Sequence, residues 1–212
     1  MLYDLSSVAD HLGRILQETE DALKLEQAVY GLDSKLEIEL QDLLAAGLRR
    51  DWEVAREVCY PSSAGSRRAS RLRCDIVLSP KGRPLRLDTA PASLFDAANP
   101  CEPSDALWLE VKSAYQFREG GMRHGGYGTQ WRSAVVEDLQ KMEADPLIHE
   151  AALLLVVFNE SEEILQKDLD LFETVLAQKE VLAGFRQTRS TAITDRIGHR
   201  LATAAIWPTI QR

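Results

Sequence analysis

A chain of 212 residues with 45% hydrophobic and 27% charged residues has the composition of a globular domain of ordinary size. Its net charge of -8 argues against a uniformly basic nucleic-acid binder, and its longest apolar stretch, AALLLVVF, is too short to cross a bilayer. Cys59, Cys74 and Cys101 have no paired spacing, which argues against a zinc ribbon and indicates a reducing compartment. We therefore expect a cytoplasmic protein with no signal peptide and no membrane partner.

Hydrophobic periodicity predicts the elements of secondary structure in chain order. A first helix spans residues 6–31, capped by Ser6 or Ser7, and a second begins after Ser34, where Glu37 three residues later completes a capping box. The remaining expectations are strands at 52–61 and 71–79 forming a hairpin, a proline-rich loop at 80–105 with a short strand at 84–88, a strand at 106–117, a glycine-rich loop at 118–128, a helix at 129–144 capped by Thr129, a buried strand at 151–160, a helix at 161–184 capped by Ser161, and one or two strands at 188–209.

This order of elements predicts the fold class. A strand–helix–strand stretch after a hairpin indicates an α/β domain of three layers, in which helices flank both sides of a mixed β-sheet. We expect residues 1–32 to form an N-terminal helical extension packed on the core, which residues 33–212 form. The acidic helix of the extension is a candidate surface for a homodimer or a protein partner.

The charge is unevenly distributed along the chain. Residues 1–46 carry ten acids and three bases, whereas residues 47–86 carry ten bases and four acids. One interpretation of the basic segment is a solvated surface whose charge is balanced by acids elsewhere in the fold. The other is a face that binds phosphates. In the second case the side chains expected on a nucleic-acid backbone are Arg67, Arg68, Arg71, Arg73, Arg123 and Arg132.

Two predicted strands carry charged residues that are suited to phosphate chemistry. Asp75 lies within CDIVL, and Glu110 and Lys112 lie within LEVK, where alternation places both on one face of the strand. Two carboxylates at neighbouring strand ends can share Mg²⁺, which lowers the pKa of a bound water, and a nearby lysine can orient that water. Glu37 could reach the same place. The alternatives are an ordinary exposed Glu/Lys pair and a capping role for Glu37.

These residues also carry a resemblance. A glutamate in LEIELQDLL, an aspartate in RLRCDIVL and Glu-x-Lys in LWLEVKSA, followed by the helix TQWRSAVVEDLQKM, resemble the PD-(D/E)XK nuclease superfamily and its restriction-endonuclease-like fold over residues 34–160. The resemblance implies that Asp75 and Glu110 bind Mg²⁺, for which Mn²⁺ can substitute, and that Lys112 is the catalytic lysine. Glu37 is favoured over Glu39 as the helix acid, although both stay open. Gln130 is expected in an accessory catalytic role.

The sequence departs from the superfamily pattern at two points. Cys74 stands where the superfamily has a proline before the aspartate, and the interval between Asp75 and Glu110 is long, so a proline-rich insertion must loop out between the strands.

The function expected is that of a metal-dependent endonuclease acting on DNA in preference to RNA. One alternative is a catalytically inactive module on the same fold that binds nucleic acid or protein. Another is an α/β enzyme for a small phosphorylated metabolite, with the glycine-rich loop as its phosphate site. Lys141 is expected to be solvated, and His199 to be structural or on the surface. Candidates for base stacking, with core packing as the alternative, are Trp52, Tyr60, Tyr115, Tyr127 and Trp131.

Overall fold

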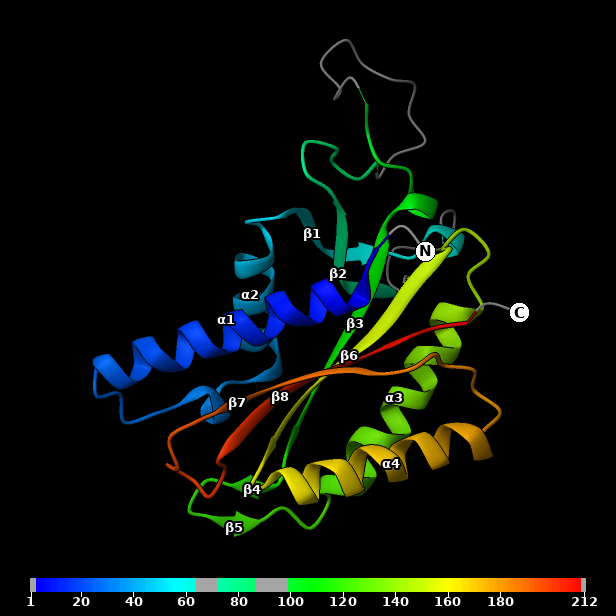
Figure 1. The fold of residues 1–212 in the computed structure, drawn as a ribbon. Helices are drawn as coiled ribbons and strands as arrows, with labels where there is room; N and C mark the ends of the chain where they lie inside the picture. The colour runs from blue at the N-terminus through cyan, green and yellow to red at the C-terminus, as the bar shows by residue number, and fades with distance from the viewer. Residues whose placement is uncertain (1–2, 64–71, 87–98, 211–212) are drawn as a thin grey trace.

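The computed structural model describes residues 3–63, 72–86 and 99–210, and for residues 129–134 it describes only the backbone. Within these ranges the chain forms an α/β fold with a mixed six-stranded sheet (Figure 1). The elements are α1 (Leu5–Leu25), η1 (Leu32–Ser34), α2 (Glu37–Leu48), β1 (Trp52–Cys59), η2 (Pro61–Ser63), β2 (Arg73–Pro80), η4 (Pro103–Asp105), β3 (Leu107–Tyr115), β4 (Phe117–Arg118), β5 (Met122–Arg123), α3 (Tyr127–Glu143), β6 (Glu150–Asn159), α4 (Glu162–Gln178), β7 (Gln187–Ala192) and β8 (Leu201–Pro208). Among the described residues, none of the helices has the length and apolar character needed to cross a bilayer.

The sheet has the strand order β1-β2-β3-β6-β8-β7. Strands β3 and β6 run parallel, and every other neighbouring pair is antiparallel. The hairpin, the third strand and the buried strand predicted from the sequence are therefore confirmed as β1, β2, β3 and β6. Strand β6 is buried along nearly its whole length, which explains its continuous apolar sequence.

Two hydrophobic cores lie on opposite faces of the sheet, so the expected arrangement of helices on both sides is confirmed (Figure 1). On one face, α1 and α2 contribute side chains such as Leu12 and Leu44. On the other face, α3 and α4 contribute side chains such as Leu139 and Phe172. Helix α1 also packs against β7, β8 and α2, which ties the N-terminal part of the chain to the C-terminal strands.

The first two helices differ from the prediction at their ends. Helix α1 ends at Leu25, six residues before Gly31, and Gln27 then adopts a φ of 52° that no helix can continue. Ser34 does not cap α2, because it belongs to the short turn η1 and the helix starts only at Glu37. The carboxylate of Glu39 accepts the backbone amide of Leu36 at 2.7 Å, so Glu39 has the capping role that was expected of Glu37.

Later elements show further differences. Helix α3 starts at Tyr127, two residues before Thr129, and α4 ends at Gln178 rather than Gly184, followed by Glu180 with a φ of 56°. The glycine-rich loop contains the short hairpin β4–β5. In the described part of the proline-rich segment, the predicted strand at 84–88 is reduced to one bridge between Leu85 and Cys101.

Candidate active site

Strands β2 and β3 diverge at the point where their acidic residues lie. Their antiparallel pairing ends at Ile76 and Leu109, and the next residues of the two strands are Asp75 and Glu110. Beyond this pair β3 continues beside β6 as far as Tyr115. The divergence lets side chains from other elements reach the backbone of β3 on the side that β2 has left.

Strand β1 is distorted at the same level of the sheet. Its pairing with β2 passes from Arg56 opposite Ile76 to Val58 opposite Cys74 and omits the intervening residue, Glu57. Glu57 has a φ of 52°, a left-handed conformation that is unfavourable for a residue with a side chain. The register is the same on both sides of this point, so no residue is inserted, and the residue of β2 that is left unpaired opposite Glu57 is Asp75.

Two carboxylates accept backbone amides of β3 beyond the divergence. Asp75 Oδ2 accepts the N–H of Val111 at 2.7 Å. Glu37, from the first turn of α2, accepts the N–H of Ser113 at 2.9 Å and its hydroxyl at 3.2 Å through Oε2. These bonds fix both carboxylates to the strand that carries Glu110 and Lys112. Of the two glutamates considered for the helix position, Glu37 is therefore the one that reaches β3.

Glu110 is buried, with 2% of its surface exposed, and two donors contact its Oε1 atom. The hydroxyl of Tyr60 donates at 2.6 Å, and the ammonium of Lys141 lies at 2.8 Å. Tyr60 follows β1 and stacks on Trp108, so it belongs to the protein interior and not to a surface for stacking bases. The expectation that Lys141 is solvated is wrong, because α3 packs on the face of the sheet toward which Glu110 points.

Helix α3 also supplies a partner for Lys112. Lys112 Nζ lies 3.1 Å from Asp138 Oδ2, and the other oxygen of Asp138 lies 2.9 Å from Lys141. Asp138 and Lys141 are three residues apart and so share one face of the helix. The sequence interpretation missed Asp138. Its signal was the stripe of buried residues Val135, Leu139 and Met142, which fixes the face of α3 that meets the sheet.

Burial sets the charge state of the two strand carboxyls. Burial and the nearby charge of Asp75 raise the pKa of Glu110 from 4.5 to about 7, although Lys141 and Tyr60 lower it. Burial also raises the pKa of Asp75, although the N–H of Val111 and the charge of Lys112 lower it. For Lys112, burial alone would lower the pKa, but the carboxylates of Asp138, Glu37 and Asp75 raise it above its usual value. Lys112 is therefore a permanent cation beside two carboxyls whose pKa values are raised, that of Glu110 to about 7.

The cluster offers carboxylate oxygens, the ligands that a hard divalent cation prefers. Among the described residues, no group of three or more histidine, cysteine, aspartate and glutamate side chains is arranged to hold a metal ion. Mg²⁺ is commonly held by one or two carboxylates, with water and substrate phosphate as the remaining ligands. Asp75 and Glu110 meet that need. Their raised pKa values indicate that ionising the two carboxyls inside the protein is unfavourable, and the positive charge of a bound cation would offset that cost. The residues present fit a hard divalent ion.

The remaining predicted site residues are either outside the described residues or exposed on strands β2 and β5. Arg67, Arg68 and Arg71 lie outside the described residues, as do the side chains of Gln130 and Arg132. Arg73 is exposed at the start of β2, two residues before Asp75. Arg123 is exposed on β5, 3.7 Å from Glu160.

The structure brings together Glu37, Asp75, Glu110 and Lys112, and adds Tyr60, Asp138 and Lys141 to them. Chemically, this cluster offers two adjacent carboxylates for a cation and a charged lysine beside them. Comparison with known proteins gives no assignment for it: the chain fits no model of a protein family, and no curated protein or solved structure matches it.

Proposed function

We propose that the chain is a metal-dependent nuclease with the restriction-endonuclease-like fold of the PD-(D/E)XK superfamily. The observation that carries the proposal is the convergence of Glu37, Asp75, Glu110 and Lys112 where β2 and β3 diverge. These side chains come from one helix and two neighbouring strands, in the order that the resemblance implies. The helix–hairpin–strand–helix–strand order of the described elements supports the same fold.

In this proposal each residue has a distinct task. Asp75 and Glu110 hold a divalent cation, which when bound lowers the pKa of a coordinated water and offsets charge that develops on the phosphate. Lys112 donates hydrogen bonds to the attacking water or to a phosphate oxygen, and Asp138 orients its ammonium. Tyr60 and Lys141 hold Glu110 in place and favour its ionised form. Glu37 fixes the strand at Ser113.

The substrate proposed is nucleic acid, with DNA favoured over RNA. A nuclease in an acidic chain needs local cations for the phosphate backbone, and Arg73 and Arg123 are exposed on the strands β2 and β5. The proposed contacts also include Arg67, Arg68, Arg71 and Arg132, and the proposed accessory residue is Gln130. Binding through these arginines would weaken as the salt concentration rises.

A second candidate is an inactive binding module on the same fold. The observation that favours it is that the acidic side chains already have protein partners: Asp75 and Glu37 accept amides of β3, and Glu110 pairs with Lys141. In such a module the cluster would stabilise the diverging strands and would not bind a cation. Only the nuclease should bind a divalent cation and require it for activity, so an experiment with a metal ion separates the two candidates.

A cleavage assay tests the proposal. Labelled duplex, single-stranded and branched DNA and RNA are incubated with the protein in Mg²⁺, Mn²⁺ or EDTA. The variants are Glu110→Gln and Lys112→Met, and the matched control is Lys81→Met, an exposed lysine beside Glu53. We expect cleavage that requires the metal and falls at least about a hundredfold in both site variants but not in the control. Cleavage that persists in EDTA, or in both site variants, would contradict the proposal.

A further inference from the structure

The ammonium of Lys141 lies where a metal ion bound to Glu110 would bring its own positive charge. Its Nζ atom is 2.8 Å from Glu110 Oε1, and Glu110 is buried, with 2% of its surface exposed. The hydroxyl of Tyr60 donates to the same oxygen at 2.6 Å. A carboxylate oxygen has about two lone-pair sites, so these two donors fill Oε1. A metal ion that binds through Oε1 must therefore displace one of them.

Binding through the other oxygen of Glu110 does not remove the conflict. Mg²⁺ lies about 2.1 Å from its oxygen ligands, so a metal ion on Oε2 would lie within about 7 Å of Lys141 Nζ. Two positive charges at this separation repel each other more strongly beside a buried carboxylate than they do in water. Lys141 and a metal ion therefore compete for the charge of Glu110, whichever oxygen the metal ion takes.

Lys141 has a second partner to which it can move. Asp138 Oδ1 lies 2.9 Å from its Nζ atom, three residues earlier on α3. Nζ also lies over the ring of Tyr60, 5.2 Å from the centroid, where a cation is attracted to the aromatic face. The lysine has a flexible four-carbon stem, and 21% of its side chain is exposed. It can therefore leave Glu110 and remain paired with Asp138.

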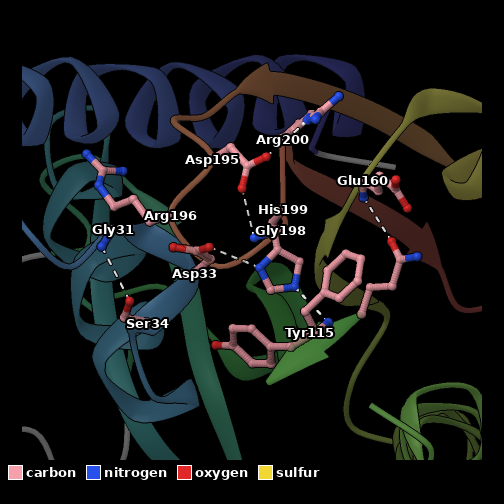
Figure 2. Close-up of polar contacts among 12 residues, drawn as sticks. Gly31, Asp33, Ser34, Tyr115, Glu160, Asp195, Arg196, Gly198, His199 and Arg200 are labelled. Carbon is pink, nitrogen blue, oxygen red and sulfur yellow. Dashed lines mark hydrogen bonds and ion pairs between the residues drawn. The ribbon is translucent and has the colours of Figure 1, made fainter. Parts of the chain in front are cut away.

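Other buried ion pairs of the chain lack such a second partner. Figure 2 shows Asp33 facing the ring of His199, and His199 Nδ1 lies 3.0 Å from Asp33 Oδ2. Glu20 is also buried and pairs with Arg196 at 3.3 Å. Within the described part of the chain, neither base forms an ion pair with a second carboxylate, so displacing either one would leave it without an ion-pair partner. In the candidate site, by contrast, the ammonium is already shared between two carboxylates.

Resting on the proposed nuclease function, we propose that Lys141 takes the place of the divalent cation in the metal-free protein and competes with it for Glu110. Lys141 neutralises the buried carboxylate while no metal ion is present. When a metal ion binds, Lys141 shifts toward Asp138. The lysine therefore lowers the affinity of the site for Mg²⁺ and Mn²⁺, and the metal-free site keeps its charges paired.

Replacing Lys141 with methionine tests the competition, because methionine keeps an unbranched side chain and removes the charge. Binding of Mn²⁺ is measured by calorimetric titration at pH 8.5, where few protons compete for Glu110, whose pKa is about 7 in the wild-type protein. The control is Lys167→Met, which removes an exposed lysine of α4 and so changes the net charge by the same amount.

We expect Lys141→Met to bind Mn²⁺ at least about tenfold more tightly than the wild-type protein and Lys167→Met do. Equal or weaker binding by Lys141→Met would overturn the proposal, because a lysine that only holds Glu110 in place should help the metal ion to bind.

A measurement on the wild-type protein covers the case in which Lys141→Met does not fold. The ammonium signals of ¹⁵N-labelled lysines are followed by NMR as Mg²⁺ is added, and the signal of Lys141 is assigned with Lys141→Arg. We expect the ammonium protons of Lys141 to exchange with water faster once the metal ion is bound, because the contact with the buried Glu110 is lost. Unchanged exchange at saturating Mg²⁺ would overturn the proposal.

The remaining outcomes separate this proposal from the proposed function. Binding of Mn²⁺ by the wild-type protein that Asp75→Asn abolishes, together with equal or weaker binding by Lys141→Met, would overturn the role of Lys141 and leave the nuclease. No binding of Mn²⁺ by either the wild-type protein or Lys141→Met would overturn both.

Discussion

Replacing Glu110 with glutamine should change how the stability of the protein depends on pH. The pKa of Glu110 is raised from 4.5 to about 7 in the folded protein, so its contribution to stability is complete below pH 4.5 and is lost as the pH rises through 7. Each pKa unit corresponds to about 1.4 kcal/mol. The unfolding free energy of the wild-type protein should therefore fall by about 3 kcal/mol through this one group between pH 4.5 and pH 8.5. Glutamine does not titrate, and the variant should therefore lose about 3 kcal/mol less over the same range.

The assay is urea unfolding of both proteins at the two pH values, in EDTA, followed by circular dichroism. The quantity compared is the change in unfolding free energy between the two pH values, so any cost of the substitution that does not depend on pH cancels. Glu163→Gln, at an exposed position of α4, serves as the control and should behave as the wild type does. Equal pH dependence in the wild-type protein and Glu110→Gln would refute the inference that Glu110 is a buried acid that titrates near neutral pH.

Substitutions at three further positions test two contacts of the site and the backbone strain beside it. Tyr60→Phe removes the hydroxyl that donates to Glu110 and should raise the pKa of that carboxyl further, by about one unit, in a ¹³C NMR titration; an unchanged midpoint would count against the contact. Glu37→Ala removes the acceptor for Ser113 and should lower the unfolding free energy by about 1–3 kcal/mol in urea, whereas Glu37→Gln, which keeps an acceptor, should cost less. Glu57→Gly should raise the unfolding free energy by about 1 kcal/mol because glycine tolerates a φ of 52°, and a lower melting temperature would show that the distortion of β1 stores no strain.

The sequence predicts the sheet better than it predicts the helix ends. Alternation and a continuous apolar run identify β3 and β6, because burial on one or both faces of a sheet leaves those patterns. The predicted end of α1 and the predicted start of α2 were wrong because backbone geometry decides both. Gln27 adopts a left-handed conformation, and Ser34 belongs to the turn η1. Neither event leaves a clear residue signature.

The residues of the candidate site also differ in how far the sequence predicts them. Asp75 could be proposed from the sequence because an acid inside an apolar strand is unusual. Glu110 and Lys112 could be proposed because they share one face of the next strand and complete the ordered set of residues on which the resemblance rests. The contacts of Asp138 and Lys141 could not, because the apolar stripe of α3 shows which face meets the sheet but not which residues of β3 that face contacts. Outside the candidate site, Asp33 Oδ2 lies 3.0 Å from His199 Nδ1. This contact joins the turn η1 to the residues before β8, and residue patterns do not predict contacts between such distant segments.

The most direct test of the central claim is calorimetric titration of Mn²⁺ into the wild-type protein and into Asp75→Asn at pH 8, because it does not depend on finding the right substrate. At this pH Glu110, whose pKa is about 7, is ionised and can bind a cation. We predict that one Mn²⁺ binds per chain and that Asp75→Asn, while still folded, loses this binding. No binding to the wild-type protein, or binding that Asp75→Asn leaves unchanged, would contradict the assignment of Asp75 and Glu110 as a cation site.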